Sequence, residues 1–153
     1  MSGRATKLAL RALDALSQGA GLHPAETPAH LTTGRRGEEE AYFYLRRLGY
    51  VIVAHNYRTP RLRGELDLVA WDGDVLCFVE VKTRSSRAVT PAEAAVDQQK
   101  RNQLSLVARD YWRRVARSAL RPPVCRFDIV SVYREQEDAP AEITLFKNAF
   151  SWA

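Results

Sequence analysis

The chain has 153 residues, of which 46% are hydrophobic and 27% charged, with a formal net charge of +5 and a pI near 9.5. This length and apolar share fit one globular domain with a single core. No apolar run reaches the roughly 18 residues of a membrane-spanning helix. The apolar stretch near the N-terminus is broken by Arg11 and Asp14, unlike a signal peptide. We therefore expect a cytoplasmic protein with no membrane partner.

The positive charge comes mainly from arginine, since only four of the 23 basic residues are lysines. A basic balance favours a polyanionic partner such as nucleic acid, and arginine binds phosphate oxygens in two-point contacts. An arginine-rich coding bias with a solvated surface would explain the same composition. Cys77 and Cys125 lie in apolar runs without zinc-ligand spacing, which indicates small buried side chains in a reducing compartment.

Residues 1–33 are predicted to be a flexible extension, because glycine and proline punctuate the segment 18–33. The ordered domain is then expected to cover residues 34–153.

The first predicted element of that domain is a helix. It rests on one stripe of residues spaced by three and four, namely Glu38, Ala41, Leu45 and Leu48. Gly49 is a suitable helix stop. A short strand at 50–53 and a polar, basic connection over 55–63 are expected to follow.

Two strand-like segments, 64–71 and 75–83, are separated by Asp72-Gly73, a strong signal for a tight hairpin. The capping sequence at 90–93 starts a helical pattern that runs toward Val115, either unbroken or broken near Asp97. One face of this helix is formed by Lys100, Leu104, Val107, Ala108 and Tyr111. Further strands are predicted at 124–133 and 143–146. This order of helices and strands predicts an α/β domain with a mixed central sheet flanked by helices.

The hairpin also predicts which side chains share a face, because opposed residues point the same way and side chains alternate along a strand. With the turn at 72–73, Asp67 and Glu80 are diagonal neighbours, roughly 7 Å apart at the backbone. With the turn at 73–74, they lie directly opposite each other. Either register places Asp67, Glu80 and Lys82 on one face.

Two carboxylates so close repel each other, and a divalent metal would neutralise them. Mg²⁺ prefers one or two carboxylates together with waters and phosphate oxygens, and Mn²⁺ suits similar oxygen ligands. Lys82 would stand beside Glu80, where its ammonium could orient or help deprotonate a water or stabilise charge on a phosphate. The pattern therefore indicates phosphodiester hydrolysis. The alternative is an exposed Glu80–Lys82 ion pair, which the apolar runs around Asp67 and Glu80 disfavour.

Other charged residues are open to two interpretations. Glu38 faces the predicted sheet, yet its position also suits a solvated charge at a helix N-terminus. Without a comparison to other proteins, the local sequence favours the solvated charge. Lys100 lies on the apolar stripe of the second helix, where it could reach a phosphate or simply extend to solvent. Asp128 is interpreted as structural, paired with Arg126 or with neighbouring basic groups. A phosphate track is predicted from basic residues flanking the hairpin: Arg58, Arg61, Arg63, Arg84 and Arg87.

Several motifs between residues 34 and 150 resemble, in order, those of the YraN family of small bacterial proteins. They are Gly34-Arg35-Arg36-Gly37-Glu38, Gly64-Glu65-Leu66-Asp67-Leu68-Val69-Ala70, Phe78-Val79-Glu80-Val81-Lys82-Thr83-Arg84, Lys100-Arg101, Arg126-Phe127-Asp128 and Asn148-Ala149-Phe150. That family looks like a branch of the PD-(D/E)XK nuclease superfamily and is similar to archaeal Holliday-junction resolvases of the Hjc type.

The resemblance implies a restriction-endonuclease-like fold with Mg²⁺ or Mn²⁺ bound by Asp67, Glu80 and the Val81 carbonyl. It implies that Lys82 is the catalytic lysine. It also implies that Glu38 belongs to the site, which reverses the interpretation of Glu38 as a solvated charge. Lys100 matches a basic position of the later helix. Leu66 departs from the superfamily pattern, which has proline before the first aspartate.

Two functions follow from these residues. The leading hypothesis is a metal-dependent endonuclease that cuts DNA, including branched or junction DNA, for which two cuts would favour a homodimer. The alternative is a catalytically inactive nucleic-acid-binding protein that keeps the nuclease fold. A third reading, an adaptor that recruits a partner through residues 1–33, has little support in the sequence. RNA as the substrate stays open.

Overall fold

The computed structural model describes residues 29–85, 96–136 and 138–153, with side chains from Thr33 onward. Residues Gly34–Ala153 form one compact unit. Most of the extension predicted over 1–33, the capping sequence at 90–93 and Arg87 lie outside the described residues. The described elements are α2 (Ala29–Arg47), β1 (Val51–Tyr57), β2 (Leu66–Asp72), β3 (Val75–Arg84), α3 (Gln98–Ser118), β4 (Val124–Tyr133) and β5 (Glu142–Phe150).

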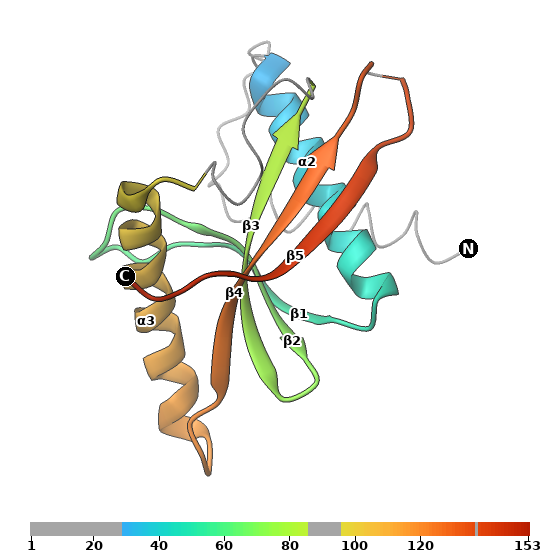
Figure 1. Cartoon of the computed structure of the whole chain (residues 1–153). Helices are drawn as coiled ribbons and strands as arrows, with labels where there is room; N and C mark the ends of the chain where they lie inside the picture. Colours follow the sequence, from blue (N-terminus) through green and yellow to red (C-terminus); the bar gives the residue numbers. More distant parts are fainter. Residues whose placement is uncertain (1–28, 86–95, 137) are drawn as a thin grey trace, which may run out of the picture. The chain divides into compact units, whose positions relative to one another are not determined.

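The five strands form one sheet in the order β1-β2-β3-β4-β5 (Figure 1). Neighbours are antiparallel except β3 and β4, which are parallel. The parallel step follows from α3, which returns the chain between these two strands. The predicted α/β domain with a mixed sheet flanked by helices is confirmed. None of the described helices is both long and apolar enough to cross a membrane.

Alternation along the strands gives the sheet two buried faces. On one face Ala41 and Leu45 of α2 pack against a cluster that includes Cys77 and Val79. On the other face Leu104, Val107 and Ala108 of α3 pack against Phe78 and Phe127, as the helical stripe predicted. Since Glu80 and Lys82 have the parity of Phe78, they project toward the face that α3 covers.

The hairpin between β2 and β3 turns at Gly73-Asp74, because Asp72 pairs with Val75. The register built on a turn at Asp72-Gly73 is therefore wrong, and the alternative register is correct. Gly73 has φ +58°, which suits the first position of a type II′ turn and which glycine adopts without strain. The turn keeps the parity that both registers shared.

Several boundaries differ from the predicted ones. Helix α2 begins at Ala29, inside the segment expected to be a linker. Strand β1 continues to Tyr57, because its polar second half pairs with β2. Strand β5 is also longer than predicted, since it pairs with β4 from Glu142 to Phe150. Leu48 is exposed because it follows the end of α2, so it does not join the core stripe.

Helix α3 begins at Gln98, directly after the position near Asp97 where a break in the helical pattern was allowed for. Asp97 is its N-cap, and the Asp97 carboxylate accepts a hydrogen bond of 2.8 Å from the Lys100 amide. This cap satisfies a backbone donor that the helix itself leaves free. It also determines where Lys100 lies on the first turn.

Candidate active site

Asp67 is the second residue of β2 and is only 7% exposed. The pairing of β2 with β3 is regular up to Leu68 and Val79, and one further step places Asp67 opposite Glu80. There the Asp67 Oδ2 accepts a hydrogen bond of 2.7 Å from the Val81 amide. The carboxylate thus binds a backbone donor of β3 next to the point where the backbone pairing of β2 with β3 ends.

Glu80 is 5% exposed, and its two carboxylate oxygens have different surroundings. Its Oε1 accepts a hydrogen bond of 3.0 Å from Lys82 Nζ and lies 3.3 Å from Lys100 Nζ. Its Oε2 is buried and has no hydrogen-bond partner in the described part of the chain. A buried carboxylate oxygen without a donor is costly, so this atom indicates a site that a ligand completes.

The negative charges at this site are crowded. Burial, followed by the charge of Glu80, raises the pKa of Asp67 well above its ordinary value of 3.8. The charge of Glu38 raises that pKa further, whereas the Val81 hydrogen bond and the charge of Lys100 lower it. Burial and the neighbouring carboxylate of Glu80 therefore disfavour the ionised form of Asp67.

The close packing of α2 on β3 explains how Glu38 reaches the site. A Cβ added at Gly37 would lie 1.9 Å from the Thr83 hydroxyl, so only glycine allows this approach. The neighbouring Glu38 is half-buried, and its charge acts on Asp67. The helical stripe indicated that Glu38 faces the sheet. The contact of Gly37 with Thr83 was not predicted, although a glycine within a helical pattern is a weak signal for close packing.

The donor atoms of Asp67 and Glu80 fit a hard divalent cation. Both carboxylates offer oxygen, and Glu80 Oε2 lacks a donor. Among the described residues, no group of three or more His, Cys, Asp or Glu side chains is arranged to enclose a metal ion. Two carboxylates are nevertheless the number that Mg²⁺ commonly takes from a protein when waters and phosphate oxygens complete its shell. The arrangement suits a cation shared with a substrate.

The structure separates the basic residues predicted to bind phosphate. Lys100 lies beside Glu80, so it belongs with the carboxylates. Arg58 is exposed and forms an ion pair with Glu65. Arg61 and Arg63 are exposed in the connection between β1 and β2. Arg84 is half-buried at the end of β3, and its carbonyl accepts a hydrogen bond from the Arg134 amide.

Asp128, by contrast, belongs to a complete network on the face covered by α2. Its carboxylate binds Arg126 Nε at 2.9 and 3.1 Å and accepts a hydrogen bond from the Asn148 amide. Arg126 also binds Asp72, at 2.6 Å, and the Tyr50 hydroxyl. Of the two kinds of partner expected for Asp128, the structure shows Arg126.

The chain is an α/β domain in which a mixed five-stranded sheet has one helix against each face. Its candidate site pairs two carboxylates with two lysines. The model of the family described as uncharacterised protein family UPF0102 matches residues 37–132. The chain therefore belongs to the UPF0102 family, the YraN family indicated by its motifs.

Relatives of the chain span several bacteria. A UPF0102 protein of Koribacter versatilis is 52% identical over 145 residues, which cover 95% of this chain and 94% of the relative. A UPF0102 protein of Solibacter usitatus is 50% identical over 117 residues, or 76% of this chain and 84% of the relative. A Pseudomonas aeruginosa relative is 42% identical over 117 residues, or 76% of this chain and 90% of that protein.

Proposed function

We propose that this protein is a metal-dependent endonuclease that hydrolyses phosphodiester bonds in DNA on a restriction-endonuclease-like fold. The observation that carries the proposal is the buried carboxylate pair. Glu80 Oε2 has no donor in the described part of the chain, and Asp67 beside it has a raised pKa. A structural pair would be matched by donors, whereas a site for a cation and a phosphate leaves such atoms free.

Asp67 and Glu80 would hold the cation, with the Val81 carbonyl proposed as a further ligand. A bound divalent cation would supply a Lewis acid for the phosphate and a water of lowered pKa. Lys82 has its Nζ 3.0 Å from Glu80 Oε1, where it can hold a water by donating a hydrogen bond to it. When water attacks phosphorus and the P–O bond breaks, the ammonium stabilises the added charge on the phosphate oxygens.

Lys100 has a separate proposed role, because it approaches Glu80 from α3 whereas Lys82 lies on β3 itself. Two ammonium groups at one carboxylate oxygen neutralise Glu80 in the absence of substrate. A phosphodiester brings its own negative charge and would take up one of these donors. Glu38 adds negative charge near Asp67, which we propose strengthens cation binding.

The test compares linear, flapped and four-way-junction DNA, together with matched RNA, with Mg²⁺, with Mn²⁺ and with chelator. We expect metal-dependent cleavage that Asp67→Asn, Glu80→Gln and Lys82→Gln each reduce by about 100-fold or more. Asp74→Asn is the matched control, since Asp74 is an exposed acid of the same hairpin. Cleavage that survives Glu80→Gln would overturn the assignment. A homodimer is expected if junctions are the preferred substrate, and light scattering measures it.

Calorimetric titration of Mg²⁺ and Mn²⁺ tests the cation site without the correct substrate. Wild type should bind, and Glu80→Gln should lose most of that affinity. DNA binding without cleavage of any substrate would favour the alternative, a nucleic-acid-binding protein that keeps the fold.

A further inference from the structure

A second feature that could recognise a ligand lies along the second half of α3. A cavity of about 490 Å³ is formed there with the start of β4 and the C-terminal residues, and this volume is within the range of small-molecule sites. Its lining residues are Arg109, Trp112, Arg113, Pro123, Val124, Cys125 and Trp152. The lining combines aromatic rings and arginines and includes no acidic residue.

The two tryptophans of this cavity are held in place. The Trp112 indole N–H donates a hydrogen bond of 3.0 Å to the Pro123 carbonyl. The Trp152 ring makes edge-to-face contacts with Phe127, at 4.9 Å between centroids, and with Phe78, at 6.0 Å. Trp152 nevertheless remains 37% exposed. A fixed and partly exposed indole loses little entropy when a planar group stacks on it.

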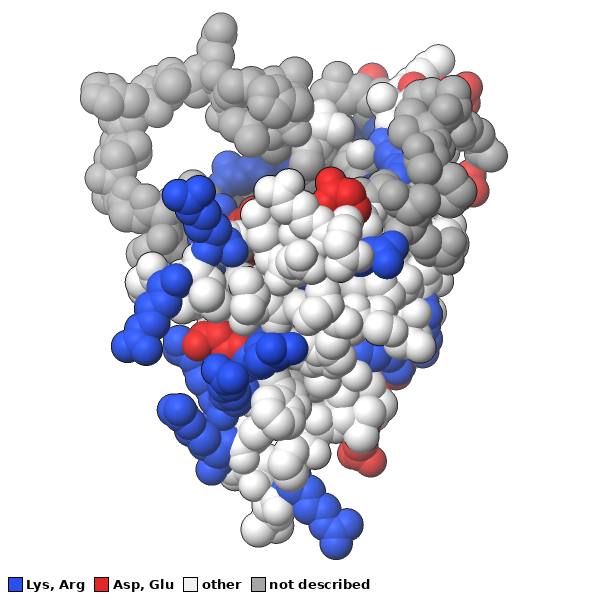
Figure 2. Space-filling view, turned by 60° about the vertical axis from the view of Figure 1, so that its left-hand side comes forward, with Lys and Arg blue, Asp and Glu red and all other residues white. Residues whose placement is uncertain are grey.

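Positive charge surrounds this indole. The Arg109 guanidinium lies over the Trp152 ring, 5.6 Å from its centroid, and Arg113 follows one turn later on α3. Figure 2 shows Lys and Arg side chains gathered on the side of the molecule that carries α3. The exposed arginines of this helix are Arg109, Arg113, Arg114 and Arg117. The cavity therefore complements an anionic ligand with a flat aromatic part.

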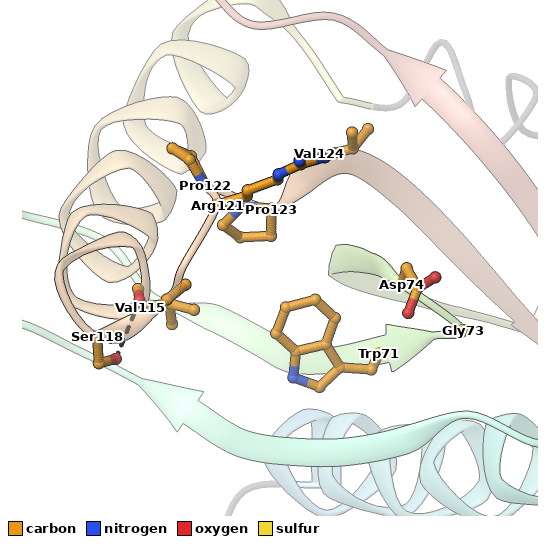
Figure 3. Close-up of a pocket in the computed structure, with 10 residues that line it drawn as sticks. Trp71, Gly73, Asp74, Val115, Ser118, Arg121, Pro122, Pro123 and Val124 are labelled. Atoms are coloured by element: carbon orange, nitrogen blue, oxygen red, sulfur yellow. Dashed lines mark hydrogen bonds between the residues drawn. The ribbon is translucent and has the colours of Figure 1, made fainter.

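A neighbouring cavity of about 670 Å³ shares Pro123 and Val124 but differs in charge (Figure 3). There Arg121 is accompanied by Asp74, and the Trp71 indole rises from β2 toward Val115 and the prolines. Trp71 also packs against the core. This cavity therefore lacks the excess positive charge of the first, and it provides a matched control.

We propose that the cavity at Trp152 binds an unpaired base of single-stranded nucleic acid, which stacks on the indole while Arg109 and Arg113 contact the adjoining phosphates. The choice of polymer rests on the proposed function. Every base can stack on an aromatic ring, and arginine suits both phosphate and base.

The test is fluorescence anisotropy of labelled (dT)₁₂, (U)₁₂ and a 12-base-pair duplex, measured with chelator so that no cleavage occurs. We expect Trp152→Leu and Arg109→Gln each to weaken single-strand binding by about fivefold or more. This is the loss in affinity that corresponds to one stacking contact of about 1 kcal/mol. Duplex binding should change less. Arg121→Gln, which removes the same charge from the neighbouring cavity, should leave single-strand affinity within about twofold of wild type.

The three arms separate the outcomes. Loss of (dT)₁₂ binding, of (U)₁₂ binding or of both in the two variants supports the site and identifies its ligand as DNA, RNA or either polymer. Single-strand binding that both variants retain, or that Arg121→Gln weakens equally, overturns it. Because Arg109 is exposed, Arg109→Gln tests the site even if Trp152→Leu disturbs the core. Failure of the proposed nuclease would appear only in the cleavage assay and would leave this result intact.

Discussion

The two aspartates of β2 lie at opposite ends of the strand and have opposite electrostatics. Asp72 binds Arg126 at 2.6 Å and Lys147 at 2.8 Å, and these hydrogen bonds lower its pKa from 3.8 to about 2. Asp67 is buried beside Glu80, and its pKa is raised well above 3.8. At one end of the strand cations favour the ionised form of Asp72, whereas at the other end burial and a second carboxylate disfavour the ionised form of Asp67.

This difference separates acids whose hydrogen-bond partners are complete from acids whose partners are incomplete. Asp128 is 0% exposed, yet Arg126 and the Asn148 amide satisfy its carboxylate, so that it stabilises the sheet. Glu80 is nearly as buried but keeps one oxygen without a partner among the described residues. The exposed fractions of Asp128 and Glu80 are similar, so burial alone does not distinguish the two acids. The two acids differ in whether hydrogen-bond donors reach all of their carboxylate oxygens, and only an oxygen without a donor is available to a ligand.

The largest expected effect concerns the matched end. Asp128→Ala removes the carboxylate that Arg126 Nε and the Asn148 amide bind, and it leaves a largely buried guanidinium without that partner. We expect the free energy of unfolding to fall by about 3–5 kcal/mol. Urea denaturation measures it. Asp128→Asn should cost less, because the amide oxygen still accepts a hydrogen bond. A loss below about 1 kcal/mol for Asp128→Ala would contradict the structural role.

A smaller effect is expected where α2 approaches the unmatched end. Gly37→Ala would push α2 away from Thr83 and should lower the free energy of unfolding by about 1–3 kcal/mol. The matched control is Gly34→Ala on the same helix, where a Cβ meets nothing within 4 Å. That change should instead stabilise the protein by about 0.5–1 kcal/mol. Equal effects of the two substitutions would contradict the close packing that brings Glu38 to Asp67.

The smallest expected effect is a gain. Because the folded state raises the pKa of Asp67, it binds a proton that the unfolded chain releases, so stability falls as pH rises above about 3.8. Asp67→Asn removes this charge while its amide oxygen can still accept the Val81 hydrogen bond. We expect the variant to be more stable than wild type by about 0.5–2 kcal/mol at pH 8.

Urea denaturation at pH 4 and pH 8 checks this gain, which should shrink at the lower pH. Added Mg²⁺ should stabilise wild type but not Asp67→Asn, since only the native carboxylate pair would bind the ion. A variant less stable than wild type at pH 8 would show that Asp67 is structural, like Asp72.

Much of the fold could be predicted from local patterns. The strand at 124–133 is confirmed with the predicted bounds, because its apolar run and the preceding prolines delimit it. The helical stripe of α3 is confirmed for its buried residues. The bounds of β1 and β5 could not be predicted, because their polar residues become strand only by pairing with a neighbour. The start of α3 after the Asp97 cap agrees with a break in the helical pattern near Asp97, whereas the capping sequence at 90–93 lies outside the described residues.

Strand alternation alone predicts that Asp67, Glu80 and Lys82 share a face, because it requires this in either register of the hairpin. Which donors reach these side chains depends on how the helices pack on the sheet. Lys100 arrives at Glu80 from α3, and Glu38 approaches Asp67 because Gly37 lets α2 pack closely on β3. Contacts between elements far apart in the chain depend on packing distances, which local periodicity does not contain.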